Sequence, residues 1–225
     1  MFLDDRKKRI LQAIVDYYLD NAEPIASKII ANDYGLELSS ATIRNEMAEM
    51  EEMGLIEKPH TSSGRIPSDL GYRYYVDDIM DVDKVDEKEI VKVLDSVNKG
   101  DKDILQAVSM ALSGATHYTS ISLDDDTMFL YGRNNVFDYP EFNDVESLKK
   151  FMYLLEEEEL IREVISKSHG PDITVKIGKE NTLEQMQDYS LITFSYQDKG
   201  DIAIVGPRRM DYSKVIGYIK YLLES

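Results

Sequence analysis

Apolar residues near the start of the chain recur at intervals of three and four, which is the spacing of one helix face. The run from Ile10 to Leu19 predicts a first helix over about 4–20. After a break, Pro24 suits the first turn of a second helix, because a proline there gives up no intrahelical hydrogen bond. Gly35 fits the left-handed position that often closes a helix. The inward face of this second helix would consist of Ile25, Ile29 and Ile30.

A third helix, a wing and a fourth helix follow in the pattern. Ser39 or Ser40 fits the N-cap of the third helix, and Gly54 ends it. Residues 55–58 and Ile66 fit two short strands on either side of a polar loop, after which Ser68 begins another helix. The buried stripe of the third helix would be Ile43, Met47 and Met50. This order of elements predicts a winged helix-turn-helix domain over residues 1–81.

Residues 82–100 are rich in charge and predict a connector between two domains. Beyond it, residues 101–225 mix strand and helix patterns, with a hairpin turn at 198–200. Helices are expected at 104–112, 144–168 and 211–223, and strands at 118–123, 127–131, 173–177, 191–196 and 202–205. Because strands and helices do not alternate regularly, we expect a mainly antiparallel sheet with helices to one side, and an α+β fold overall.

Charge restricts the functions open to this chain. The formal net charge is -17, and residues 1–80 carry nine lysines and arginines against fifteen aspartates and glutamates. Such a balance argues against indiscriminate coating of nucleic acid, whose affinity rests on cations meeting phosphates. It permits a dipolar domain with a few cations on one face. The absence of cysteine, of a signal-peptide pattern and of a long apolar run predicts a cytoplasmic protein that does not enter a membrane.

The third helix carries the clearest chemistry. Its polar face near the N-terminus presents Ser40, Thr42, Arg44 and Asn45. Arginine pairs with guanine and asparagine with adenine in the major groove, while hydroxyl groups bind phosphates or contact a thymine methyl group. An ordinary surface helix of a helical bundle would look the same in isolation. The two preceding helices and the following wing favour DNA recognition.

The wing offers groups that suit a DNA backbone. His60, Thr61 and Ser62 would supply ring nitrogen and hydroxyl contacts, and Arg65 would meet a phosphate or enter the minor groove. A plain hairpin loop is the alternative, and His60 fits either reading. The cationic run 6–9 reads as a solvated helix end rather than a DNA contact, since cations gain nothing beside a positive helix N-terminus.

Catalytic and metal-binding constellations are missing from the sequence. The three histidines, His60, His117 and His169, are far apart, and no glycine-rich phosphate loop occurs. The acidic run 124–126 lacks the glycine and distal glutamate of a calcium loop, so it reads as an exposed turn. We therefore expect no enzyme activity and no cofactor.

Several long motifs resemble one family. They are Glu23-Pro24-Ile25-Ala26-Ser27-Lys28, the segments 39–47, 59–67 and 71–77, Pro140-Glu141-Phe142 and the segment 205–212. Together they resemble the HrcA heat-inducible transcription repressors of bacteria along nearly the whole chain.

The resemblance implies a winged helix followed by a GAF-like domain that contains an inserted dimerising domain. It implies repression of chaperone operons through an inverted-repeat operator called CIRCE, with double-stranded DNA and the chaperonin GroEL as partners. It also adds Ser27 and Lys28 to the expected DNA contacts. A small-molecule-responsive regulator that senses a ligand through the GAF-like domain is the alternative function.

The chain departs from the family pattern near residues 124–127. Family members are considerably longer, and here one predicted strand runs almost directly into the next where the inserted domain is expected. An inverted repeat nevertheless requires two recognition helices, so we still expect a homodimer. Candidate contacts, with packing on their own sheet as the alternative, are Phe151, Met152, Leu155, Val215, Ile219 and Leu222.

Overall fold

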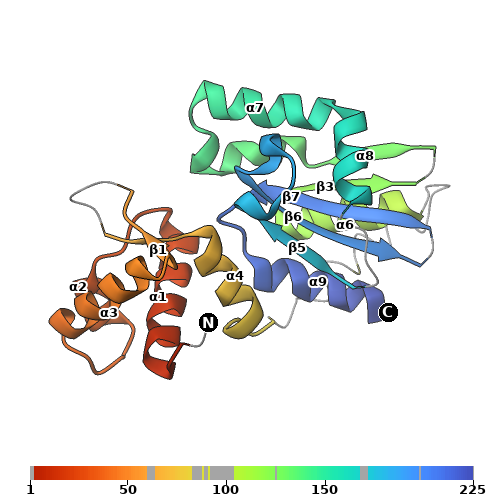
Figure 1. Ribbon diagram of the computed structural model, residues 1–225. Coiled ribbons are helices and arrows are strands. Elements are labelled where there is room, and N and C mark those ends of the chain that lie inside the picture. The colour runs from red at the N-terminus through yellow and green to blue at the C-terminus, as the bar shows by residue number, and fades with distance from the viewer. Residues whose placement is uncertain are drawn as a thin grey trace. The chain divides into compact units, whose positions relative to one another are not determined.

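The computed structural model describes residues 3–59, 64–82, 104–124, 126–167, 172–197 and 199–224, together with Lys88 and Val91 (Figure 1). The chain forms two compact units, Met1–Asp81 and Val82–Ser225. The predicted wing tip at 60–63 and most of the predicted connector lie outside the described residues.

The first unit is a winged helix-turn-helix. Its elements are α1 (Asp5–Asn21), α2 (Ser27–Asp33), α3 (Ser40–Glu52), β1 (Ile56–Glu57), β2 (Ile66–Pro67) and α4 (Asp69–Asp78). Side-chain oxygens cap three of the helices, since Asp4, Ser39 and Ser68 accept from the backbone amides of Lys7, Thr42 and Gly71. The core contains the predicted stripe of α3, because Ile43, Met47 and Met50 are all buried.

The second helix is shorter than predicted. It begins at Ser27, and Ile25 is extended instead of helical. The Ile25 amide donates to the Arg65 carbonyl at 3.0 Å, and the Arg65 amide donates to the Ile25 carbonyl at 2.9 Å. These bonds add Ile25 to the edge of the wing. A Cβ atom at Gly64 would lie 2.2 Å from the Ile25 carbonyl oxygen, so glycine permits this close pairing.

The second unit is built on one antiparallel sheet in the order β4-β3-β7-β6-β5. Its strands are β3 (Thr119–Leu123), β4 (Met128–Tyr131), β5 (Thr174–Ile177), β6 (Tyr189–Tyr196) and β7 (Gly200–Pro207). Its α-helices are α6 (Ile104–Thr116), α7 (Val145–Glu156), α8 (Glu158–Ser166) and α9 (Tyr212–Glu224). Four short 3-10 helices, none of them predicted, occupy Arg133–Asp138, Pro140–Phe142, Gly178–Glu180 and Glu184–Met186.

Helices cover both faces of this sheet, so the expectation of helices to one side was wrong (Figure 1). One face packs against α7 and α8, where Ile121, Leu191 and Val205 share a core with Phe151 and Ile165. On the other face, serines anchor α6 and α9 to the sheet. Ser120 bonds Ser109 at 2.8 Å, and Ser190 bonds Tyr212 at 2.7 Å. Side chains alternate across each strand, which explains how one sheet supports both layers.

The single helix predicted over 144–168 is two helices. Glu157 separates them with φ -84° and ψ 78°, outside the helical region. The break lets both helices turn apolar residues to the same core, Leu154 and Leu155 from α7 and Ile161 and Val164 from α8.

The residues suggested as dimer contacts are largely unavailable for that role. Phe151, Leu155, Val215, Ile219 and Leu222 are all buried within their own unit. Phe151 and Leu155 share a core with residues of their own sheet, as the alternative interpretation held. Of the set, only Met152 is partly exposed.

A tight turn stands where the inserted domain is expected. The Asp124 amide donates to the Thr127 carbonyl at 3.0 Å. The Asp124 carboxylate accepts from the Thr127 amide at 2.6 Å and from its hydroxyl at 2.7 Å. β3 and β4 pair directly from this turn, with Leu123 opposite Met128. Asp124 thus closes a hairpin at this position.

Candidate nucleic-acid interface

The N-terminal half of α3 presents two polar side chains to solvent. Ser39 caps the helix, so Arg44 and Asn45 fall one turn inside its positive end. Both side chains are exposed, and among the described residues neither has a hydrogen-bond or ion-pair partner. Free amide and guanidinium groups at this position are available to read base edges.

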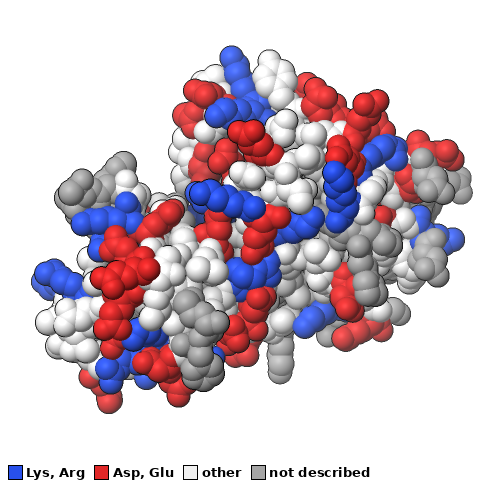
Figure 2. All heavy atoms as spheres, in the orientation of Figure 1, with Lys and Arg blue, Asp and Glu red and all other residues white. Residues whose placement is uncertain are grey.

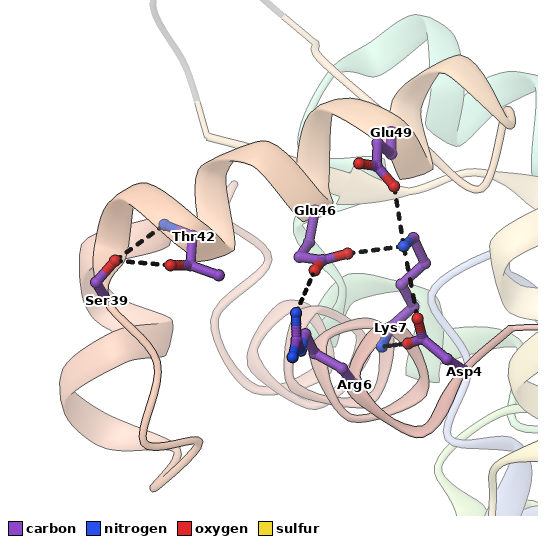
Figure 3. A network of polar contacts seen from close by, with 7 residues as sticks. All are labelled: Asp4, Arg6, Lys7, Ser39, Thr42, Glu46 and Glu49. Atoms are coloured by element: carbon purple, nitrogen blue, oxygen red, sulfur yellow. Dashed lines mark hydrogen bonds and ion pairs between the residues drawn. The ribbon is translucent and has the colours of Figure 1, made fainter.

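The hydroxyl groups around the start of α3 are engaged within the protein. Thr42 Oγ1 lies 2.8 Å from Ser39 Oγ, and Ser40 Oγ lies 3.2 Å from Ser27 Oγ (Figure 3 shows the Ser39–Thr42 pair). Ser27 is buried, so its contact with Ser40 joins α2 to α3. Ser40 and Thr42 are each partly exposed, and a rotatable hydroxyl group can donate to a phosphate oxygen.

Lys28, one residue into α2, is exposed and has no partner within the described ranges. It therefore presents an unpaired cation on the helix that precedes α3. The other predicted wing contacts, His60, Thr61 and Ser62, lie outside the described residues.

Arg65 has a partner that its sequence neighbours do not reveal. Its Nε and Nη2 atoms donate to Glu51 Oε2 at 2.9 and 2.6 Å, and its side chain is 19% exposed. Glu51 lies near the end of α3, so this ion pair ties the base of the wing to the recognition helix.

The cationic run at 6–9 is only in part a solvated helix end, because Arg6 and Arg9 are exposed but the Lys7 side chain is 12% exposed. Lys7 Nζ lies 2.8 Å from Glu46 Oε2 and 2.9 Å from Glu49 Oε2, and Arg6 Nη1 lies 3.0 Å from Glu46 Oε1 (Figure 3). Contact with Glu46, and then with Glu49, raises the pKa of Lys7 above its ordinary range. The contact with Lys7 in turn lowers the pKa of Glu46. These pairs join the first turn of α1 to α3.

The charge distribution of the first unit is mixed. Figure 2 shows lysine and arginine side chains interspersed with aspartate and glutamate over the visible face of this unit. The visible face therefore offers no broad cationic field to a polyanion.

Other kinds of site have little support in the described part of the chain. No group of three metal-ligating side chains occurs there. None of the helices in those ranges has the length and apolar composition needed to cross a membrane.

Comparison with known proteins decides the family. The family described as "Winged helix-turn-helix transcription repressor, HrcA DNA-binding" matches residues 2–76, and "HrcA protein C terminal domain" matches residues 80–216. The chain belongs to the HrcA family. HrcA proteins are heat-inducible transcription repressors, and the first unit is the DNA-binding domain of such a repressor, not part of an enzyme.

Curated HrcA proteins match along the whole chain. The heat-inducible transcription repressor of Acetivibrio thermocellus is 32% identical over 332 positions, which cover 99% of this chain and 95% of the relative. Those of Ruminiclostridium cellulolyticum and Carboxydothermus hydrogenoformans are 31% and 32% identical, with 99% and 98% of this chain covered and 96% of each relative. A crystal structure of a hypothetical protein shares the fold, with a TM-score of 0.75 at 16% identity, and covers 99% of this chain and 97% of that one.

The alignments also measure the difference in length from other HrcA proteins. The matched stretch of 332 positions exceeds the 225 residues of this chain by 107. This HrcA chain is therefore shorter than its relatives by about the size of a small domain.

Proposed function

We propose that this HrcA chain represses chaperone operons by binding an inverted-repeat operator of the CIRCE type as a two-fold dimer. The observation that carries the proposal is the exposed, unpartnered pair Arg44 and Asn45 near the capped start of α3. A helix presented in this way suits insertion into the major groove, with one copy for each half-site.

The remaining contacts are assigned supporting roles. Lys28 and the wing residues His60, Thr61, Ser62 and Arg65 hold the DNA backbone, and the partly exposed Ser40 and Thr42 contact phosphate. Ser27 is buried, so its part is to position α3 through its contact with Ser40. Backbone contacts fix register, and base contacts supply specificity. The family resemblance further supports a cytoplasmic protein whose activity depends on the chaperonin GroEL.

A dimer supplies the affinity that charge does not. A single winged helix with few free cations binds a half-site weakly. Joining two of them makes the second contact intramolecular, which raises its effective concentration.

The test is a binding titration of the full chain over a range of salt concentrations. Three duplexes are compared: an inverted repeat, a single half-site and a scrambled sequence. We expect the inverted repeat to bind at least a hundredfold more tightly than the half-site, within the range that avidity provides (about 10²–10⁴). Equal affinity for all three duplexes would remove the proposed function.

A second candidate function rests on a cavity in the second unit. It has a volume of about 760 Å³ and is lined by polar side chains that include Gln106, Asp124, Arg162, Lys199 and Asp201. A polar metabolite bound there would make the protein a ligand-responsive regulator. Repeating the titration with metabolite pools tests this, because a ligand-dependent shift in operator affinity would favour the second function.

A further inference from the structure

The helix that we propose enters the DNA groove is itself acidic. α3 carries four glutamates, Glu46, Glu49, Glu51 and Glu52, against the single arginine Arg44. Glu49, Glu51 and Glu52 lie within its last four residues, where the helix dipole already places partial negative charge, and no basic residue occupies its last turn. DNA phosphates repel such a surface. The helix therefore requires cations from elsewhere to approach DNA closely.

Two other elements supply these cations. Lys7 on α1 contacts both Glu46 and Glu49, and Arg6 contacts Glu46 again (Figure 3). At the end of α3, Arg65 from the wing pairs with Glu51. Three of the four glutamates are thus paired with a cation, two of them by the first turn of α1.

The pairing lies away from the face that would read DNA. Successive residues of a helix are separated by about 100°, so Glu46 points roughly opposite to Arg44. Glu46 and Glu49 are three residues apart and share one face. The side chains of Lys7 and Glu46 are each only 12% exposed. The contact is therefore held between two helices, and Arg44 and Asn45 stay free on the outside.

The same geometry argues against a direct phosphate contact by Lys7. Its ammonium group already lies within 3 Å of two carboxylates and 3.8 Å from Asp4 Oδ2. Cations in the first turn of α1 are also disfavoured by that helix's own dipole. The neutralisation of α3 explains why they are placed there.

We propose that Lys7 is required for operator binding because it neutralises Glu46 and Glu49 on the recognition helix, without itself touching DNA. The inference rests on the proposed function of α3.

The test measures binding of the full chain to an inverted repeat and to a scrambled duplex at several salt concentrations. Four proteins are compared: wild type, Lys7→Met, Lys8→Met as a control with the same loss of charge on α1, and the triple variant Lys7→Met/Glu46→Gln/Glu49→Gln. Lys7→Met should weaken operator binding roughly three- to tenfold, because it leaves Glu49 without its cation and Glu46 with Arg6 alone. The dependence of log K on log salt should keep the wild-type slope.

The triple variant should restore the affinity to within about twofold of wild type, because removal of the carboxylates makes Lys7 dispensable. Lys8→Met should have little effect. If the slope of log K against log salt falls by about one unit in Lys7→Met and the triple variant does not restore the affinity, Lys7 binds phosphate directly. If Lys7→Met binds the operator as tightly as Lys8→Met does, the network does not affect binding. Either result overturns the inference.

Two controls keep the outcome interpretable. Circular dichroism and thermal unfolding report whether Lys7→Met folds. If it does not fold, Glu46→Gln/Glu49→Gln with Lys7 in place decides the matter, since neutralisation predicts affinity equal to wild type or higher. A lower affinity, measured at a temperature where circular dichroism shows the variant fully folded, contradicts the inference. If wild type itself shows no preference for the inverted repeat, the proposed function fails. If wild type prefers the inverted repeat and Lys7→Met binds it equally well, the inference about Lys7 fails while the proposed function stands.

Discussion

At the residue scale, the Arg65 side chain has one contact in the free protein, with Glu51, and a second that we propose with DNA. It is proposed to bind DNA, but its guanidinium donates to Glu51 Oε2 through two nitrogen atoms in the free protein. A phosphate must compete with that carboxylate for the same donors.

Glu51→Gln removes the competing charge while preserving the size of the side chain. We expect tighter binding to specific and random duplexes alike, by about two- to fivefold, because one repulsive charge is lost near the backbone. Arg65→Ala should weaken binding and lower the salt slope by about one unit. Filter binding or anisotropy on both duplexes measures these changes. If both variants weaken binding equally and leave the slope unchanged, the ion pair has only a structural role.

Glu46 gives the first unit a dependence on acid pH. Its pKa is lowered from the usual 4.5 by contact with Lys7 and then Arg6, in a network that also includes Glu49 and Asp4. A carboxyl group with a lowered folded-state pKa stabilises the fold above pH 4.5, and this contribution is lost as pH falls through the folded-state pKa. Glu46→Gln should therefore destabilise the protein near neutral pH and have a diminishing effect below about pH 4. Urea unfolding of both proteins at several pH values measures the difference, and a constant difference across the acid range would contradict the assignment.

The sequence predicts the local features of the candidate site better than the contacts between residues that are distant along the chain. A serine cap and an apolar stripe are local signals. They placed Ile43 and Met50 correctly and narrowed the cap to Ser39 or Ser40, of which the structure has Ser39. The glutamate partners of Lys7 lie 39 and 42 residues further along the chain, and the partner of Arg65 lies 14 residues before it. Only tertiary packing brings these residues together. The carboxylates of α3 were visible in the sequence. Four glutamates on a helix proposed to approach DNA are the sequence signal that cations from other elements pair with it.

At the element scale, packing set the boundaries that periodicity could not. Ile25 continued the apolar pattern of a helix, but its backbone pairs with Arg65 in the wing. The long apolar pattern from 144 to 168 did not show the break at Glu157, because both halves contribute to one core. The antiparallel strands were predictable from alternation and turns, whereas the covering of both sheet faces depends on where α6 and α9 dock.

Gly71 shows how closely α4 packs on the chain before the wing. A Cβ atom at this position would lie 2.0 Å from the Leu55 carbonyl oxygen. Gly71→Ala should destabilise the first unit by about 1–3 kcal/mol, the usual cost of forcing an extra methyl group into a packed site. The control is Gly114→Ala in α6, where no atom lies within 4 Å and alanine favours the helix. Calorimetry should show a lower melting temperature for the first variant and an equal or higher one for the second. Equal changes in melting temperature for the two variants would contradict the close packing at Gly71.

At the scale of the whole molecule, a chain with a net charge of -17 is proposed to bind a polyanion. Ion pairs within the protein engage three of the four glutamates of α3, and we propose that two copies of the chain bind the operator together. A tight Asp124–Thr127 turn stands where the resemblance led us to expect a dimerising insertion, and the apolar residues of α7 and α9 are mostly buried. A dimer must therefore use other surface.

Sedimentation equilibrium of the full chain, with and without an inverted-repeat duplex, tests the assembly. We expect a dimer at micromolar concentration and two chains on each duplex, because the half-sites are related by a two-fold axis. A chain that stays monomeric and binds one copy per duplex would contradict the dimer, while leaving recognition of a half-site open.

The most direct test of the central claim is whether the exposed face of α3 reads bases. Wild type and Arg44→Ala are titrated with an inverted repeat, with versions of it that carry single base-pair changes, and with random DNA. The account predicts that Arg44→Ala loses about 1–3 kcal/mol on the intact repeat, becomes indifferent to base changes at one position in each half-site, and binds random DNA nearly as wild type does. An equal loss on specific and random DNA, with base preferences unchanged, would contradict base reading by α3.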